Sequence, residues 1–146
     1  SGLPSRTPDD DDLLETLRAH DDGTEQLFVL ADERGQVPAT NLADARDLAQ
    51  GIHLALIRRE AVGEAFNIGP DAPHGEDELV RHIADRLGLR VLIIPRPHVR
   101  PSWYVSSAKA RGILGYRPQH TVFSMVDEAV AAKRIDAAVA QLPPAP

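Results

Sequence analysis

The chain has 146 residues, about the length of one domain, and its formal net charge is −6. It contains no cysteine, which excludes a disulfide framework, a thiolate metal site and a cysteine nucleophile. The negative charge disfavours a nucleic-acid partner, because such binding needs a basic surface. No apolar run reaches the roughly 18 residues of a membrane span and no signal-peptide pattern is present, so we expect a cytoplasmic protein.

We expect one domain over residues 1–146, with disordered ends at residues 1–8 and 142–146. The first predicted helix follows Asp9, Asp10, Asp11 and Asp12 and reaches about His20. Carboxylates at a helix start stabilise its free N–H groups and its dipole. A metal-binding acidic cluster is the alternative, but consecutive aspartates on a helix point in different directions.

Next, residues 27–30 form a short apolar run that predicts a buried strand. Apolar residues at helical spacing over 45–56 predict a helix, with Asp44 as N-cap and Asp47 three residues later. A strand over 65–68 and a helix over 79–87 that stops at Gly88 follow.

Residues 91–94 predict a strand that Pro95 ends, and the chain to Tyr104 is irregular. A short helix over 107–114 and a longer one from Thr121 complete the pattern. We expect the longer helix to face inward with four apolar residues: Phe123, Val126, Ala129 and Val130. Together the segments predict an α/β fold with about four to five helices and a few short strands.

Four motifs stand in a fixed order: Ala65-Phe66-Asn67-Ile68-Gly69, a helix from Glu78-Leu79 to Leu87-Gly88, Ser106-Ser107-Ala108-Lys109, and Leu114-Gly115-Tyr116-Arg117-Pro118. In this order they resemble the C-terminal portion of extended short-chain dehydrogenases/reductases, the NAD-dependent epimerase/dehydratase family. The resemblance covers nearly the whole chain. It implies the family's small substrate lobe, with the Rossmann core absent. Two departures are Leu3-Pro4-Ser5, where the family has Tyr-Gly-Pro, and Ser106, where it has Asp.

The family's cofactor and catalytic motifs are missing from the chain. There is no glycine-rich phosphate turn, so we expect no cofactor bound by this chain, although the resemblance implies NAD(P) for the full-length family. The family's catalytic Tyr has a Lys four residues on, whereas Ala108 follows Tyr104 and His120 follows Tyr116 at that spacing. We therefore expect no catalytic residue in this chain and no hydride transfer by it alone.

In the family, the segment before the Lys-containing turn lies beside the substrate's diphosphate. Here it holds Arg96, His98 and Arg100, followed by Trp103 and Tyr104. Guanidinium groups suit phosphate, and an aromatic ring can stack on a base or sugar. The alternative is that the arginines are solvated loop charges and Trp103 belongs to the core.

Asn67 is a further substrate-binding candidate, because the resemblance places it at the end of a strand beside the substrate. It could instead satisfy the turn that follows the strand. We expect Lys109 to be a solvated charge. The six histidines contain no pair at helical ligand spacing, so a metal site is not expected.

These patterns predict the substrate-binding lobe of an NAD(P)-dependent nucleotide-sugar epimerase, dehydratase or reductase. The alternative is a freestanding, non-catalytic binding or assembly module derived from that lobe. The expected partners are a nucleotide sugar or similar phosphorylated small molecule and the missing Rossmann half, with neither nucleic acid nor membrane involved. An unpaired strand at residues 66–68 predicts a homodimer or a rearranged strand.

Overall fold

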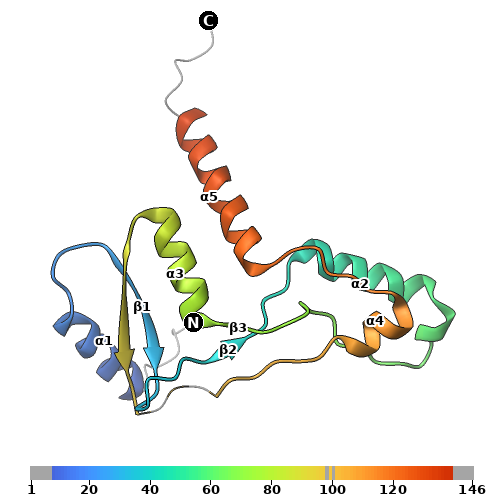
Figure 1. The fold of residues 1–146 in the computed structure, drawn as a ribbon, viewed down its shortest axis with the longest axis horizontal. Coiled ribbons are helices and arrows are strands. Elements are labelled where there is room, and N and C mark those ends of the chain that lie inside the picture. The colour runs from blue at the N-terminus through green and yellow to red at the C-terminus, as the bar shows by residue number, and fades with distance from the viewer. Residues whose placement is uncertain (1–7, 98, 100, 140–146) are drawn as a thin grey trace, which may run out of the picture.

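The computed structural model describes residues 8–97, 99 and 101–139. Two groups of elements are joined by extended segments (Figure 1). One group holds α1 (Pro8–Ala19), β1 (Gln26–Ala31), α3 (Glu76–Leu87), β4 (Arg90–Pro95) and α5 (Val122–Val139). The other holds α2 (Ala45–Ile57), the 3-10 turn η1 (Arg59–Ala61) and α4 (Ala108–Leu114), and β2 (Ala39–Thr40) and β3 (His74–Gly75) lie between the groups. The expected α/β fold, with five helices and a few short strands among the described residues, is confirmed.

The strands β1 and β4 form a parallel pair, with Phe28 opposite Leu92 in register. A parallel pair needs a long crossover, which here contains α2 and α3. Val29 and Ile94 are buried in this pair, and α3 contributes buried Ala84. Both strands were expected from their apolar runs. Within the described part of the chain, no helix is long and apolar enough to cross a membrane.

The α2/α4 group has its own small core. Ala110, Leu114 and Tyr116 are fully buried. Five partly buried residues pack against them: Leu54, Ala55, Ala61, Phe66 and Ile68. Apolar side chains from α2, α4 and the 66–68 segment therefore hold this group together.

The helix ends follow the capping signals in the sequence. Asp44 caps α2 by accepting a hydrogen bond from the Arg46 N–H at 2.8 Å. Gly88 ends α3 at φ 71°, a left-handed conformation that favours glycine. The capping role expected of Ser106 falls short: its hydroxyl accepts from the Ala108 N–H at 3.3 Å, but the N-cap residue of α4 is Ser107, whose side chain makes no capping hydrogen bond.

The expected strand at residues 65–68 is wrong. Residues 64–70 have no regular secondary structure. Phe66 and Ile68 pack on the α4 core, but no backbone hydrogen bond joins residues 66–68 to any other described residue. A strand needs a neighbour to pair with, and the described residues supply none here.

The apolar face expected on α2 is exposed. Leu48 is 36% exposed, Ile52 59% and Leu56 80%. The opposite side of the helix faces α4 and the chain beside it, with Asp47 and Gly51 buried. An amphipathic helix normally buries its apolar stripe, so this stripe is a surface that lacks a cover among the described residues.

Smaller expectations also need correction. Pro8, expected in a disordered end, is the first residue of α1. Ala129, expected to face inward on α5, is exposed, whereas Phe123, Val126 and Val130 are partly buried. The other residues expected to be disordered, 1–7 and 142–146, lie outside the described residues.

Candidate functional site

The segment that follows β4 connects the two groups of elements. It runs from the carboxyl end of β4 to α4 along one side of the molecule (Figure 1). The Trp103 N–H donates to the Ala39 carbonyl at 3.2 Å, and the Val105 N–H donates to the Asn41 side chain at 3.3 Å. The segment thus follows β2 and carries most of the residues predicted to bind substrate.

Arg96 lies at the start of this segment and is buried. Its backbone N–H donates to the Ala31 carbonyl at 2.8 Å. Its guanidinium Nη1 lies 2.8 Å from a carboxylate oxygen of Asp12 on α1. Arg96 is therefore not a solvated loop charge, and Asp12 neutralises part of its charge. Asp12, interpreted as a helix-start charge, has this second role.

Trp103 and Tyr104 lie in the middle of the segment and face solvent. Trp103 is 56% exposed and Tyr104 is 61% exposed. The alternative that Trp103 belongs to the core is wrong. Trp103 lines a hollow of ≈ 510 Å³ together with parts of β1, Thr40, Asn41 and residues of α3. An exposed indole beside a partly apolar hollow can stack on a flat ring.

Asn67 faces the far end of the segment. Its side-chain Nδ2 donates to the Ser106 carbonyl at 3.5 Å, a long hydrogen bond. Nearby, the buried Ser107 hydroxyl donates to the Gly69 carbonyl at 3.1 Å. The Asn67 side chain therefore contacts the backbone of the segment after β4 rather than a turn of its own segment.

The structure therefore spreads the predicted residues along the segment. Arg96 lies at its start, Trp103 and Tyr104 in its middle, and Asn67 opposite its end. His98 and Arg100, also predicted to bind substrate, lie outside the described residues.

Lys109 is more than the solvated charge expected from the sequence. Its Nζ lies 2.6 Å from a carboxylate oxygen of Glu64 and donates to the Ala65 carbonyl at 2.9 Å. It also lies over the Phe66 ring, 4.9 Å from the centroid. The hydrogen bond from Lys109 holds the pKa of Glu64 below its usual value. Lys109 thus ties α4 to the segment that contains Asn67.

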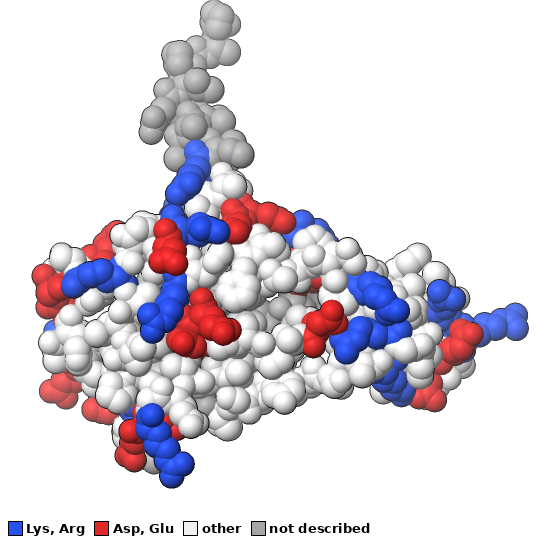
Figure 2. All heavy atoms as spheres, viewed as in Figure 1, with Lys and Arg blue, Asp and Glu red and all other residues white. Residues whose placement is uncertain are grey.

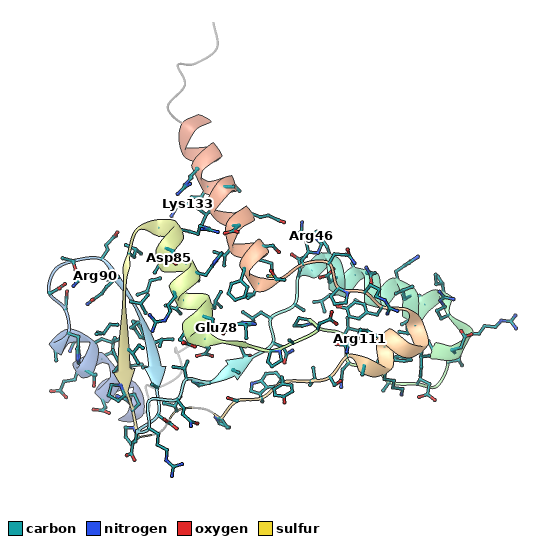
Figure 3. All side chains as sticks on the ribbon, in the orientation of Figure 1. Arg46, Glu78, Asp85, Arg90, Arg111 and Lys133 are labelled. Carbon is teal, nitrogen blue, oxygen red and sulfur yellow. The ribbon has the colours of Figure 1, made fainter. Side chains whose placement is uncertain are left out.

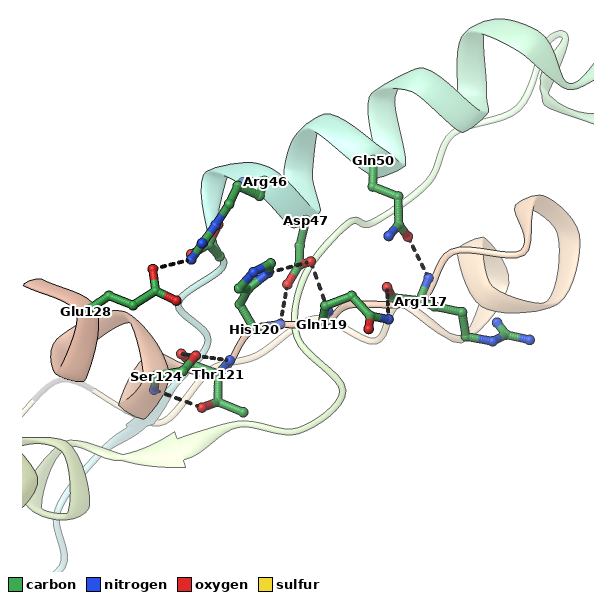
Figure 4. Close-up of polar contacts among 10 residues, drawn as sticks. Arg46, Asp47, Gln50, Arg117, Gln119, His120, Thr121, Ser124 and Glu128 are labelled. Atoms are coloured by element: carbon green, nitrogen blue, oxygen red, sulfur yellow. Dashed lines mark hydrogen bonds and ion pairs between the residues drawn. The ribbon is translucent and has the colours of Figure 1, made fainter.

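A polar cluster that the sequence did not reveal fixes the other connection between the groups. Asp47, on the first turn of α2, accepts backbone N–H bonds from Gln119 and His120, both at 2.9 Å (Figure 4). The His120 ring Nδ1 lies 3.0 Å from the same carboxylate. Asp47 is 3% exposed. Its position three residues after the N-cap predicted a capping role, but the carboxylate instead holds the turn that leads into α5.

The charge on Asp47 is maintained by these contacts. Burial alone would raise the pKa of its carboxyl group, because it disfavours the charged form. The two backbone hydrogen bonds and the His120 ring outweigh burial and hold the pKa below its usual value. One residue earlier, Arg46 Nη2 lies 2.8 Å from Glu128 and joins α2 to α5 directly (Figure 4).

Charges of both signs lie side by side on the face shown in Figure 2. Many of them form ion pairs, such as Arg111 with Asp71 and Arg90 with Asp22. Among the described residues, no group of three or more His, Asp or Glu side chains could hold a metal ion.

No protein-family model and no curated protein matches the chain. Solved structures do. A short-chain dehydrogenase/reductase superfamily protein from Agrobacterium tumefaciens, with bound NAD, is 30% identical over 90% of this chain and 40% of its own, with a TM-score of 0.77. The UDP-N-acetylglucosamine 4-epimerase of Bacillus cereus has a TM-score of 0.60 and 24% identity, over 92% and 43% of the two chains.

A third similar structure is the UDP-glucose-4-epimerase of Stenotrophomonas maltophila with bound NAD and formylated UDP-arabinopyranose. It has a TM-score of 0.60 and 19% identity, over 95% of this chain and 44% of that one. The chain thus spans about 40% of the length of the structures it matches. The epimerase and dehydratase structures share its fold. The similarity to the Agrobacterium tumefaciens protein places the chain, as a portion of a longer relative, in the short-chain dehydrogenase/reductase superfamily.

Proposed function

We propose that the chain is the substrate-binding lobe of an NAD(P)-dependent enzyme that acts on nucleotide sugars as an epimerase, dehydratase or reductase. The observation that carries this proposal is the 30% identity to an NAD-bound superfamily protein over 90% of this chain. The chain has neither a glycine-rich phosphate turn nor a Tyr–Lys pair. Its contribution is therefore to bind and orient substrate, and it transfers no hydride alone.

The substrate class is supported by the ligands of similar proteins and by the exposed segment after β4. One similar structure contains formylated UDP-arabinopyranose, and another is a dTDP-glucose 4,6-dehydratase. On this chain, Trp103 and Tyr104 present rings that suit a base or sugar. Arg100 is the preferred phosphate ligand, because Asp12 already pairs with Arg96.

The NAD(P) of the complete enzyme would be held by a Rossmann unit outside this chain. Two features of the α2/α4 group fit a contact with such a unit. The exposed stripe of Leu48, Ile52 and Leu56 offers apolar area, and the backbone of residues 66–68 offers N–H and C=O groups that no backbone group among the described residues pairs.

Calorimetric titration of the chain with UDP-glucose, dTDP-glucose and NAD tests the proposal. We expect a nucleotide sugar to bind, and Trp103→Ala or Arg100→Ala to weaken that binding by about tenfold or more, equivalent to about 1.4 kcal/mol. Arg58→Ala is the matched control, because Arg58 is exposed at the C-terminal end of α2. Tight NAD binding by the chain alone, or equal losses in all three variants, would contradict it.

A further inference from the structure

The contact between α3 and α5 places one phenylalanine ring between two histidines. The ring of Phe123, on the first turn of α5, meets His74 edge-on at a centroid distance of 6.3 Å. It meets His82 of α3 in the same manner at 5.2 Å. His74 belongs to β3, which leads directly into α3. Phe123 is therefore the point at which α5 rests on both β3 and α3.

His74 is suited to this contact only while it is neutral. The residue is 8% exposed, and its Nε2 has no hydrogen-bond partner among the described residues. Burial lowers the pKa of the imidazole, and Glu78 at the start of α3 opposes that effect in part (Figure 3). A proton added to His74 would place a charge in a buried position where its Nε2 has no acceptor among the described residues.

His82, unlike His74, contacts a carboxylate. Its Nε2 lies 2.8 Å from Asp127, on the second turn of α5. Arg86 binds the same carboxylate through Nε at 2.6 Å. The Arg86 hydrogen bond lowers the pKa of Asp127 to about 2. Asp127 therefore keeps its charge in mild acid, and its contact with Arg86 holds the second turn of α5 on α3.

The chain before α5 is also held by a contact that survives mild acid. His120 lies against the carboxylate of Asp47, which stays ionised because its pKa is below the usual value. Among the described residues, His82 and His120 each contact a carboxylate directly, whereas His74 has no hydrogen bond or ion pair to an acidic side chain and feels Glu78 only through its charge.

We propose that the His74–Phe123 contact is an acid-sensitive switch: protonation of His74 releases the first turn of α5 from β3, while Asp127 keeps the second turn on α3. The release would open a hollow of ≈ 290 Å³ between the 70–74 loop and the start of α5, which both His74 and Phe123 line. The movement is local, because the Asp47–His120 contact holds the chain on the other side.

Met125 gives a direct test, because it is the only methionine in the chain and lies on the first turn of α5. In protein labelled at the methionine methyl carbon, we expect the single NMR signal to shift on acidification, with a midpoint below the ordinary histidine pKa of 6.5. The opening constant should rise by up to about tenfold for each pH unit in that range.

The variants separate the two histidines. In His74→Leu the Met125 signal should not respond to acid, and in His82→Gln it should respond as in the wild type. A transition that persists in His74→Leu, or is lost in His82→Gln, overturns the proposal.

A second measurement keeps the proposal testable if His74→Leu does not fold. The His74 ring proton signals of the wild-type protein should titrate with the same midpoint as the Met125 methyl. A His74 midpoint that differs from the Met125 midpoint, or a Met125 signal that does not move while His74 titrates, also overturns it.

Discussion

The carboxylate of Asp47 binds His120 at two points, the backbone N–H at 2.9 Å and the ring Nδ1 at 3.0 Å. One side chain on α2 thereby fixes the turn between α4 and α5. Because Asp47 is 3% exposed, its charge is stable only while these donors are present. This contact and the segment after β4 set the relative position of the two groups of elements.

Replacement of Asp47 should reduce stability in a pH-dependent manner. We expect Asp47→Asn to lower the free energy of unfolding by about 2–3 kcal/mol at pH 7, because hydrogen bonds to a buried charge are lost. The pKa of folded Asp47 lies below its usual value of 3.8. Its contribution is therefore fully present above that value and lost as pH falls through the folded pKa. Urea unfolding at pH 7 and pH 3 measures the difference.

Asp85→Asn is the matched control, because Asp85 is an exposed aspartate on α3 (Figure 3). Its effect at pH 7 should stay within about 0.5 kcal/mol. Equal effects of the two substitutions on the free energy of unfolding would show that the Asp47 contacts do not stabilise the fold. The same would follow if the difference in unfolding free energy between wild type and Asp47→Asn became larger in acid.

Two helical glycines should respond oppositely to alanine. A Cβ at Gly51 would lie 2.6 Å from the Ile68 Cγ2, whereas a Cβ at Gly112 would meet nothing within 4 Å. Gly112→Ala should stabilise the chain by about 0.5–1 kcal/mol through helix propensity. Gly51→Ala should destabilise it by about 1–2 kcal/mol, because overpacking exceeds that gain. Thermal unfolding measures the stability change of each variant. A stabilising Gly51→Ala would mean that Ile68 does not pack against α2.

The helices and the two paired strands could be predicted from the sequence, whereas the irregular conformation of residues 65–68 could not. Apolar periodicity and caps such as Asp44 and Gly88 depend on neighbours in sequence, so the five helices were found. The β1 and β4 strands followed from their apolar runs. The 65–68 segment has an equally strand-like pattern, but a strand also needs a partner, and its pattern carries no information about whether one is present.

The candidate site was predictable only in part. The resemblance placed Trp103 and Tyr104 in an irregular segment. It did not predict that Trp103 is exposed, because an irregular segment has no periodic pattern that separates buried from exposed positions. The partner of Arg96 could not be foreseen, since Asp12 is 84 positions away in the sequence. The role of Asp47 was missed because a carboxylate in the first turn of a helix is usually explained by its effect on the free N–H groups and the dipole of that same helix.

The exposed stripe on α2 should make the isolated chain self-associate. We expect light scattering to show a mass that rises with concentration, because Ile52 and Leu56 leave apolar area in water. The double substitution Ile52→Glu and Leu56→Glu should return the chain to a monomer with little change in thermal stability. Val62→Glu is the control, because Val62 is exposed and lies just after the η1 turn. This substitution tests whether the self-association depends on the stripe of α2. A wild-type monomer at high concentration would contradict this prediction.

The most direct test of the account is to locate the nucleotide-sugar site by NMR. Backbone amide signals of the labelled chain are followed while UDP-glucose or dTDP-glucose is added. We expect the largest shifts in the segment after β4, around Trp103 and Tyr104, and we expect no comparable shifts from NAD. Saturable shifts caused by NAD, or sugar-nucleotide shifts confined to other parts of the chain, would contradict the substrate-lobe assignment.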